Sequence, residues 1–282
     1  MFVVAGVSGN TGSVVAETLL AAGSPVRVIV RDAAKGAPWV AKGAEVRIAD
    51  LADAAALGAA LEGADGAYLL VPPNPVATDP LAYMAGVVDA IVAAVALVPH
   101  VVFLSSIGAE QVDGTGPIRG LHAAEPRLVA AAAATTFVRA AYFMENWGGS
   151  LGALDQGILP VFSAGNVPFE QVATRDIGRV AAAALLAGPK GHQVIELAGP
   201  APLSAADVAE VVSTIVGKPI VVHEATIEGL IPLYVSFGMS AGMAGLYDEM
   251  TRGMGQGKLR FLGTPTRGTV PVDVVLRRLL GR

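Results

Sequence analysis

Short runs of Val, Ile, Leu and Ala alternate along this chain with longer alanine-rich stretches of helical character. The short runs are continuously apolar, which is typical of strands that are covered on both faces. Strand and helix in alternation predict an α/β fold with a doubly wound parallel sheet. The expected strands are residues 2–5, 26–30, 45–49, 67–71, 101–105, 136–139 and 194–197. The expected helices are residues 11–22, 53–61, 80–98, 121–133 and 176–186.

The regular alternation breaks after Ser150. A helix is expected to open at Ser204, which has the side chain of an N-cap, and a stretch rich in Gly and Met follows over residues 238–257. This change indicates a smaller C-terminal lobe that holds the substrate. The expected division is a Rossmann-type domain over residues 1–150 and a lobe over residues 151–282, with residues 166–199 returning to the Rossmann core.

The first expected strand runs directly into a glycine-rich turn with the spacing G-x-x-G-x-x-G. Glycine permits a tight turn and lets backbone N–H groups approach a pyrophosphate, which the N-terminus of the next helix also attracts. An ordinary strand-to-helix turn is the alternative, but the position between a strand and a helix favours a dinucleotide site. The residues of this turn are Gly6, Val7, Ser8, Gly9, Asn10, Thr11 and Gly12.

Two signals at the end of the second strand bear on the choice between NAD and NADP. Asp32 follows Gly12 by 20 residues, where an acid can bind the ribose 2′-hydroxyl of NAD. Arg31 and Lys35 can instead hold the 2′-phosphate of NADP, with Asp32 serving as the N-cap of a segment that starts at Ala33. The paired cations favour NADPH over NADH.

Further cofactor contacts are expected where later strands end. Asp50 and Leu51 are placed to meet the adenine, although Asp50 can also act as a helix cap. The strand ending at Val71 runs into Pro72 and Pro73, which places bare backbone at the edge of the sheet where ligands of such folds bind. We therefore expect Val71 and Pro72 to contact the ribose region.

Composition narrows the class of protein. With 53% hydrophobic and 15% charged residues the chain should form a large core. The longest apolar stretch, residues 84–98, contains Asp89 and is shorter than the about 20 residues that span a bilayer. The N-terminus has no basic region of a cleavable signal, so we expect a cytoplasmic protein without membrane partners.

Charge and the metal-binding residue types argue against a nucleic-acid-binding protein and against a metal site. A net charge of −5 offers no basic field for a nucleic acid. Cysteine is absent, and no two histidines have the helical spacing of a metal site, so no metal is expected. The four histidines are His100, His122, His192 and His223.

Several short motifs, weak alone, occur in an order that resembles the NmrA-like, atypical short-chain dehydrogenases and reductases over nearly the whole chain. These motifs are Gly6 to Gly12, Val30-Arg31-Asp32 with Lys35, Gly43 to Val46 with Asp50-Leu51, Leu70 to Pro73, Phe103 to Ser106, His122 with Glu125, Phe143 to Asn146, Thr174 to Ile177 and Gly217 to Pro219. That family includes quinone, azo-dye and triphenylmethane reductases.

The resemblance implies NADPH binding through Arg31 and a substrate that sits between the lobes. It also implies direct transfer of hydride from the nicotinamide to a flat, conjugated acceptor. The residues implied on the nicotinamide side are Ser105, Tyr142, Phe143 and Asn146, and those expected to contact the substrate are Pro73, Phe143, Trp147 and Phe162. Each has a structural alternative: a solvated strand end for Ser105, core aromatics for Tyr142 and Phe143, and a helix cap for Asn146.

The Tyr-x-x-x-Lys pair that carbonyl-reducing short-chain dehydrogenases use is absent. None of the five tyrosines has a lysine four residues later, and no lysine lies between Lys42 and Lys190. The candidate proton donors are therefore His122 and Tyr142, and His122 can equally be a packing residue of its helix. A quinone or azo acceptor needs less help from an acid, because solvent can protonate it.

These observations predict an NADPH-dependent oxidoreductase that acts on a small planar conjugated acceptor. The alternative is a non-catalytic redox sensor that binds NADP and a protein partner, since both functions share one nucleotide site. Long apolar helices such as residues 80–98 also permit a homodimer.

Overall fold

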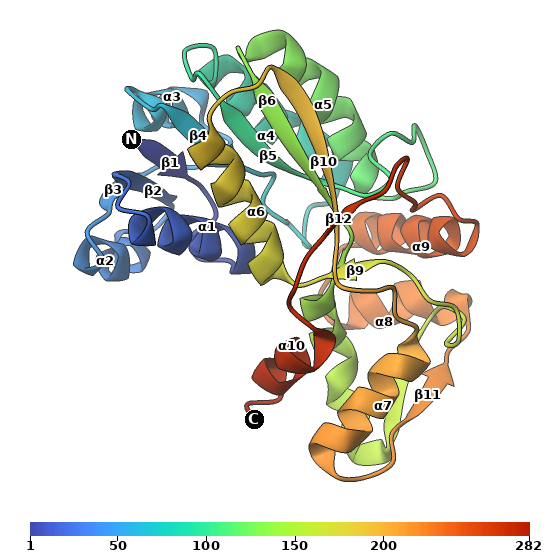
Figure 1. Ribbon diagram of the computed structural model, residues 1–282. Helices are drawn as coiled ribbons and strands as arrows, with labels where there is room; N and C mark the ends of the chain where they lie inside the picture. Colours follow the sequence, from blue (N-terminus) through green and yellow to red (C-terminus); the bar gives the residue numbers. More distant parts are fainter.

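The computed structural model describes all 282 residues and is built around one parallel sheet of eight strands (Figure 1). The strand order is β12-β10-β6-β5-β4-β1-β2-β3, so the chain moves outward from β1 to β3 and then returns to the other side of β1. The strands are β1 (Phe2–Val4), β2 (Val26–Val30), β3 (Glu45–Ile48), β4 (Gly66–Leu69), β5 (Val101–Ser106), β6 (Thr135–Ala140), β10 (His192–Ala198) and β12 (Thr266–Arg267). This arrangement confirms the doubly wound α/β fold, and the reversal at β1 is the point where such sheets bind ligands.

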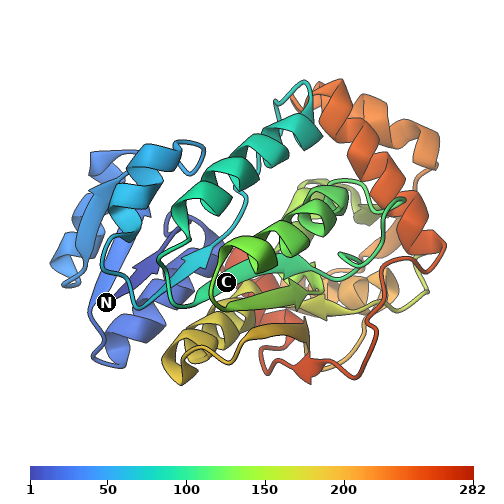
Figure 2. The ribbon, with the colours of Figure 1, turned by 90° about the horizontal axis from the view of Figure 1, so that it is seen from above.

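Helices cover both faces of the sheet. Figure 2 shows α4 and α5 on one side and α6 on the other. Side chains of α1 and α2 share a buried cluster with those of α6, whereas α3 contributes to the cluster under α4 and α5. The helices are α1 (Asn10–Ala21), α2 (Ala33–Ala41), α3 (Ala54–Leu61), α4 (Pro80–Ala94), α5 (Ile118–Ala131) and α6 (Thr174–Ala187).

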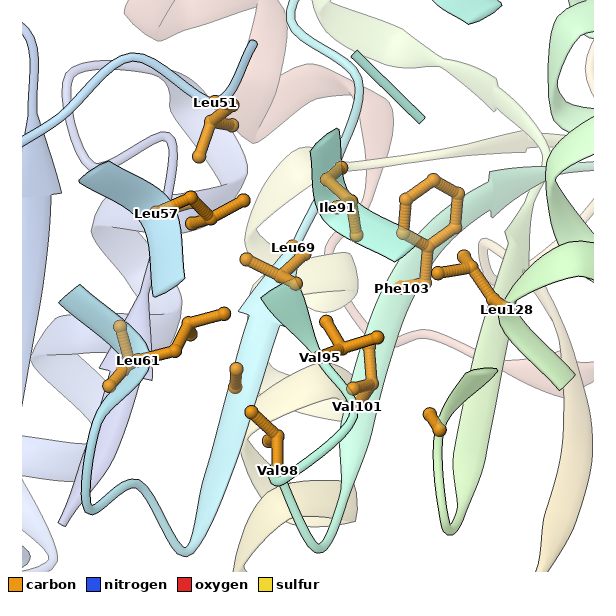
Figure 3. Packing of buried hydrophobic residues seen from close by; sticks show 14 of the residues in the cluster. Leu51, Leu57, Leu61, Leu69, Ile91, Val95, Val98, Val101, Phe103 and Leu128 are labelled. Carbon is orange, nitrogen blue, oxygen red and sulfur yellow. The ribbon is translucent and has the colours of Figure 1, made fainter. Parts of the chain in front are cut away.

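The core under α3, α4 and α5 shows why the strand sequences are continuously apolar. Leu57 of α3, Ile91 of α4 and Leu128 of α5 pack onto side chains of the central strands (Figure 3). Leu69 and Phe103 are among those strand residues, and both are fully buried. Since the alternate residues of these strands point into the second cluster, most positions of the strands meet apolar partners.

The remaining elements form a lobe beyond the carboxyl ends of the strands (Figure 1). Its core gathers Met144, Trp147, Val208 and Leu276 from separate segments. The short pair β7 (Tyr142–Phe143) and β9 (Gln171–Val172) connects the lobe to the sheet. The other elements are η1 (Met144–Gln156), β8 (Ile158–Val161), α7 (Ala205–Val216), β11 (Val221–Glu224), η2 (Ile227–Gly229), α8 (Leu230–Ser236), α9 (Ala241–Gly255) and α10 (Val272–Leu279).

Helix α9 packs directly on the loops that follow β4 and β5. The Ser240 hydroxyl donates to Ala77 O at 2.5 Å while its oxygen accepts from the Met243 N–H, so one side chain caps α9 and ties it to the first loop. A Cβ on Gly253 would collide with Gly114 O in the second loop. The backbone of α9 therefore contacts the backbone of the loop after β5. In this way α9 covers the loops at the carboxyl ends of β4 and β5.

The predicted elements agree with the structure in type but differ at some ends. The helix expected over residues 80–98 stops at Ala94, four residues before Val98, and α2 was foreseen only as a segment starting at Ala33. Pro38 lies within α2 and removes one backbone donor there, which weakens its helical pattern. None of the helices combines the length and apolarity needed to cross a bilayer.

We predict that Gly253→Ala destabilises the protein by about 1–3 kcal/mol, because the added methyl group must push α9 away from the Gly114 carbonyl. The control is Gly245→Ala in the same helix, where a Cβ meets nothing within 4 Å. There alanine should stabilise by about 0.5–1 kcal/mol through its helix propensity. Urea unfolding of both variants measures the difference, and equal free energies would contradict the close contact.

Candidate functional site

The glycine-rich turn after β1 has a geometry that side chains would block. Gly6 has a φ of 69°, and a Cβ there would lie 2.6 Å from Leu70 Cδ2. A Cβ on Gly12 would collide with the backbone oxygens of Ala5 and Gly6. Gly6 therefore makes the tight turn, and Gly12 lets α1 pack against β1.

The N-terminus of α1 lacks the side-chain cap that several neighbouring helices have. Its N-cap is Gly9, whereas Asp32, Asp53 and Asp79 cap α2, α3 and α4 with carboxylates. The first N–H groups of α1 are thus free of side-chain partners and point out of an edge where Ser8, Gly9 and Asn10 are exposed. These N–H groups form a phosphate cradle, which fits the pyrophosphate of the dinucleotide expected from the sequence. Thr11 is buried and accepts a hydrogen bond from the Tyr68 hydroxyl at 2.9 Å.

The end of β2 presents two cations that have no acidic partner. Arg31 and Lys35 are exposed and form no ion pair, although Lys42 in the same region binds Glu17. Asp32 accepts the Ala34 N–H at 2.9 Å and caps α2. The carboxylate that could bind a ribose hydroxyl is therefore engaged as a cap, and the two free cations match a phosphate.

The residues that follow β3 and β4 lie at the same edge of the sheet. Asp50 is exposed and accepts the Ala52 N–H at 2.9 Å, while the Leu51 side chain lies in the core (Figure 3). Leu51 can therefore face a ligand only through its backbone. Val71 and Pro72 are half-buried at the end of β4, and Pro73 is exposed in the loop that α9 covers.

Ser105 belongs to a buried polar network at the end of β5. Its hydroxyl donates to Glu125 at 2.6 Å, and the Arg139 guanidinium donates to both oxygens of that carboxylate at 3.0 and 2.6 Å. Hydrogen bonding to Glu125 raises the pKa of Arg139 above its ordinary value. The alternative of a solvated strand end for Ser105 is wrong, because the residue is buried.

Glu125 was predicted only as part of a motif, and Arg139 was not predicted at all. A signal was available, because Glu125 lies on the apolar side of its helix and Arg139 interrupts an apolar strand. A buried charge at such positions requires an opposite charge nearby. Glu125 and Arg139 form this ion pair. The Glu125 carboxylate also accepts the hydrogen bond that the Ser105 hydroxyl donates.

His122 lies on α5 and contacts the loop after β5. Its Nδ1 is 2.9 Å from Ala109 O, which fits an N–H donor at that nitrogen. The ring also borders a shallow cavity of about 280 Å³ between α4 and α5, together with Leu81 and Val88. This placement connects His122 with the loop after β5 and with the groove between α4 and α5.

Tyr142 begins the segment that leads from β6 into the lobe. Its ring packs edge to face on Trp147 at 6.1 Å and on Phe169 at 5.4 Å between centroids. Burial raises the pKa of Tyr142 strongly, and the nearby phenols of Tyr234 and Tyr247 add to the increase. The Tyr142 phenol therefore keeps its proton at neutral pH.

Residues 143–147, which follow Tyr142, differ in burial and in their contacts. Phe143 is half-buried against the sheet, and Asn146 is exposed. Trp147 is buried and donates from Nε1 to Gln171 Oε1 at 2.8 Å, so its ring is held in place. Glu145, between them, accepts the Thr174 N–H at 3.0 Å and thus binds the start of α6.

Phe162 joins a second aromatic group, supplied by α8 and α9. Its ring lies 6.4 Å from that of Tyr234, which lies 5.5 Å from that of Tyr247, both in edge-to-face geometry. Phe162 therefore belongs to the aromatic group of α8 and α9. No group of three acidic, histidine or cysteine side chains in the molecule could hold a metal ion.

The sheet order and the glycine cradle define a dinucleotide-binding fold of the Rossmann class. The sequence model of the NmrA-like family matches residues 1–253, and the chain belongs to that family. The resemblance expected from the motifs is thereby confirmed.

Three relatives illustrate the similarity. The NAD(P)H azoreductase of Xenophilus azovorans is 29% identical over 253 residues, which are 89% of this chain and 86% of the relative. The structure of an NADPH-dependent quinone oxidoreductase from Escherichia coli in complex with NADPH is 25% identical, with a TM-score of 0.77 over 100% of this chain and 95% of that one. The Citrobacter sp. triphenylmethane reductase with NADP(H) is 20% identical, has a TM-score of 0.76 over 99% of both chains, and shares the fold.

We predict that Glu125→Gln destabilises the protein by about 2–3 kcal/mol, because it leaves the Arg139 charge without its closest partner. Glu110→Gln is the control, since its carboxylate contacts the same guanidinium at only 3.4 Å. That change should cost less than about 1 kcal/mol. Thermal or urea unfolding of the two variants compares them, and equal losses would show that Glu125 does not dominate the network.

Proposed function

We propose that this protein is an NADPH-dependent oxidoreductase that transfers hydride directly to a small planar conjugated acceptor such as a quinone or an azo compound. The observation that carries the proposal is the juxtaposition at one edge of the sheet of a phosphate cradle and an aromatic group. The cradle consists of the uncapped α1 terminus beside Arg31 and Lys35, and the aromatic group surrounds Tyr142. The names of the azoreductase and the quinone oxidoreductase support the same reaction type.

The residues of the cradle hold the cofactor in this proposal. Backbone N–H groups from Gly9 to Gly12 bind the pyrophosphate, and Arg31 with Lys35 binds the 2′-phosphate. Asp50, with the backbone of Leu51, adjoins the adenine, Val71 and Pro72 adjoin the ribose, and Ser105, Phe143 and Asn146 adjoin the nicotinamide. NADPH supplies the hydride when it is bound.

Few side chains of this chain can donate a proton to the acceptor. The proposal therefore favours an acceptor that can be reduced without a proton donor from the protein. The Tyr142 phenol has a raised pKa and holds its proton too firmly to donate it readily. His122 directs Nδ1 to the Ala109 carbonyl, so we assign it to positioning the loop after β5. A quinone or azo compound spreads the incoming electron pair over its conjugated system, and water can supply the proton.

The substrate contacts in this proposal come from the carboxyl edge of the sheet and from the lobe. Pro73 belongs to the loop that contacts α9, and Phe143 and Phe162 are both half-buried. Trp147 is buried, so it supports the pocket by fixing the Tyr142 ring. These flat apolar walls suit a planar acceptor.

The proposal is tested by following NADPH absorbance with quinones, azo dyes and enones as acceptors. We expect NADPH oxidation to depend on both protein and acceptor, and reactions lacking either one are the controls. Tight NADPH binding without acceleration by any acceptor would refute the enzyme. That result would favour a nucleotide-binding redox sensor, which needs the cradle but no acceptor.

Arg31→Ala should weaken NADPH binding by about 10- to 100-fold, because a charge-assisted contact to the 2′-phosphate is lost. NADH lacks that phosphate, so its affinity should change less than about threefold. The control is Lys42→Ala, which removes a cation that is already paired with Glu17. Titration of both nucleotides measures the effect, and equal losses for NADPH and NADH would exclude recognition of the phosphate by Arg31.

A further inference from the structure

Three tyrosines from separate elements carry phenols that interact with one another. Tyr142 comes from β7, Tyr234 from α8 and Tyr247 from α9. The rings of Tyr234 and Tyr247 meet edge to face at 5.5 Å, and the phenols of both act on the pKa of Tyr142. In Figure 1, α8 and α9 lie next to β9, the strand that pairs with β7.

These hydroxyl groups have no partners of their own. The Tyr68 hydroxyl bonds to Thr11, whereas those of Tyr142, Tyr234 and Tyr247 form no hydrogen bond in the chain. They are also not among the fully enclosed polar atoms without a partner, which belong to other residues. A polar group of this kind must face an opening that solvent or a ligand reaches.

We infer that Tyr142, Tyr234 and Tyr247 form the subsite that recognises the acceptor and select quinones by donating hydrogen bonds to a carbonyl oxygen. This inference rests on the proposed function and names its substrate class. Tyr247 was not a candidate for the site from the sequence.

The chemistry of a phenol matches a quinone oxygen. Burial raises the pKa of all three tyrosines, so each phenol stays protonated and can donate. A carbonyl oxygen has two lone pairs and can accept from two donors. The rings of Phe162 and Phe169 pack on those of Tyr234 and Tyr142 and provide flat apolar contacts for the ring of the acceptor.

The same hydrogen bonds strengthen during reduction. Hydride from NADPH brings two electrons and one proton to the quinone, which becomes the hydroquinone monoanion with its charge on oxygen. A proton from water then completes the hydroquinone. Phenols aimed at that oxygen stabilise the developing charge without losing their own protons.

Binding to the NADP⁺-loaded protein tests the subsite without hydride transfer. A naphthoquinone and naphthalene, which share a ring system and differ in the carbonyl groups, are titrated into the wild type, Tyr234→Phe and Tyr247→Phe. Quenching of tryptophan fluorescence reports binding, because Trp147 lies 6.1 Å from Tyr142. Each substitution should raise the Kd of the quinone about three- to tenfold and leave that of naphthalene unchanged.

The control is Thr251→Val, which removes a hydroxyl from α9 that bonds only to the Tyr247 carbonyl of its own helix. It should leave both affinities unchanged. The inference is overturned if the wild type does not bind the quinone or if the tyrosine substitutions leave the Kd of the quinone unchanged. It is also overturned if the substitutions raise the Kd of the quinone and that of naphthalene equally. A quinone that binds through the hydroxyl groups while NADPH is never oxidised would refute the proposed function and leave the subsite intact.

Discussion

The contact between α1 and β1 sets the geometry on which the whole site depends. Gly12 brings α1 against the backbone of Ala5 and Gly6, and Gly178 brings α6 equally close to α1, at 2.9 Å between its virtual Cβ and Thr11 O. Glu145 then binds the start of α6 through Thr174. Because each of these contacts is short, the phosphate cradle, α6 and the first residues of the lobe keep a fixed relation to one another.

A second series of contacts anchors α9 to the loops after β4 and β5. Ser240 ties the start of α9 to the loop after β4, and Gly253 rests on the loop after β5. Glu249 of α9 accepts the Gly114 N–H at 2.7 Å and pairs with Arg119 of α5. The lobe that carries the aromatic group is therefore anchored to the sheet domain at two places.

The sequence was most informative where one local pattern decides the structure. The strands from 2 to 140, the glycine turn and the Ser204 cap could be predicted because periodicity, glycine spacing and capping act within a few residues. The pairing of Glu125 with Arg139 and the meeting of Tyr142 with Tyr234 could not, because partners far apart in the chain meet only through the tertiary fold. The cap that Asp32 provides is information of the same kind, since it became visible only with α2 in place.

The absence of a Tyr-x-x-x-Lys pair and the presence of three half-buried phenols bear on one property, the readiness of a phenol to give up its proton. A lysine beside a tyrosine lowers the pKa of the phenol and prepares it to give up a proton. Here no cation approaches Tyr142, and burial with two further phenols raises its pKa instead. Under the proposed function, such a site stabilises charge on the acceptor by hydrogen bonds and leaves protonation to water. The proposal therefore favours an acceptor whose reduced anion is already stabilised by conjugation over an isolated ketone, whose alkoxide requires a proton as it forms.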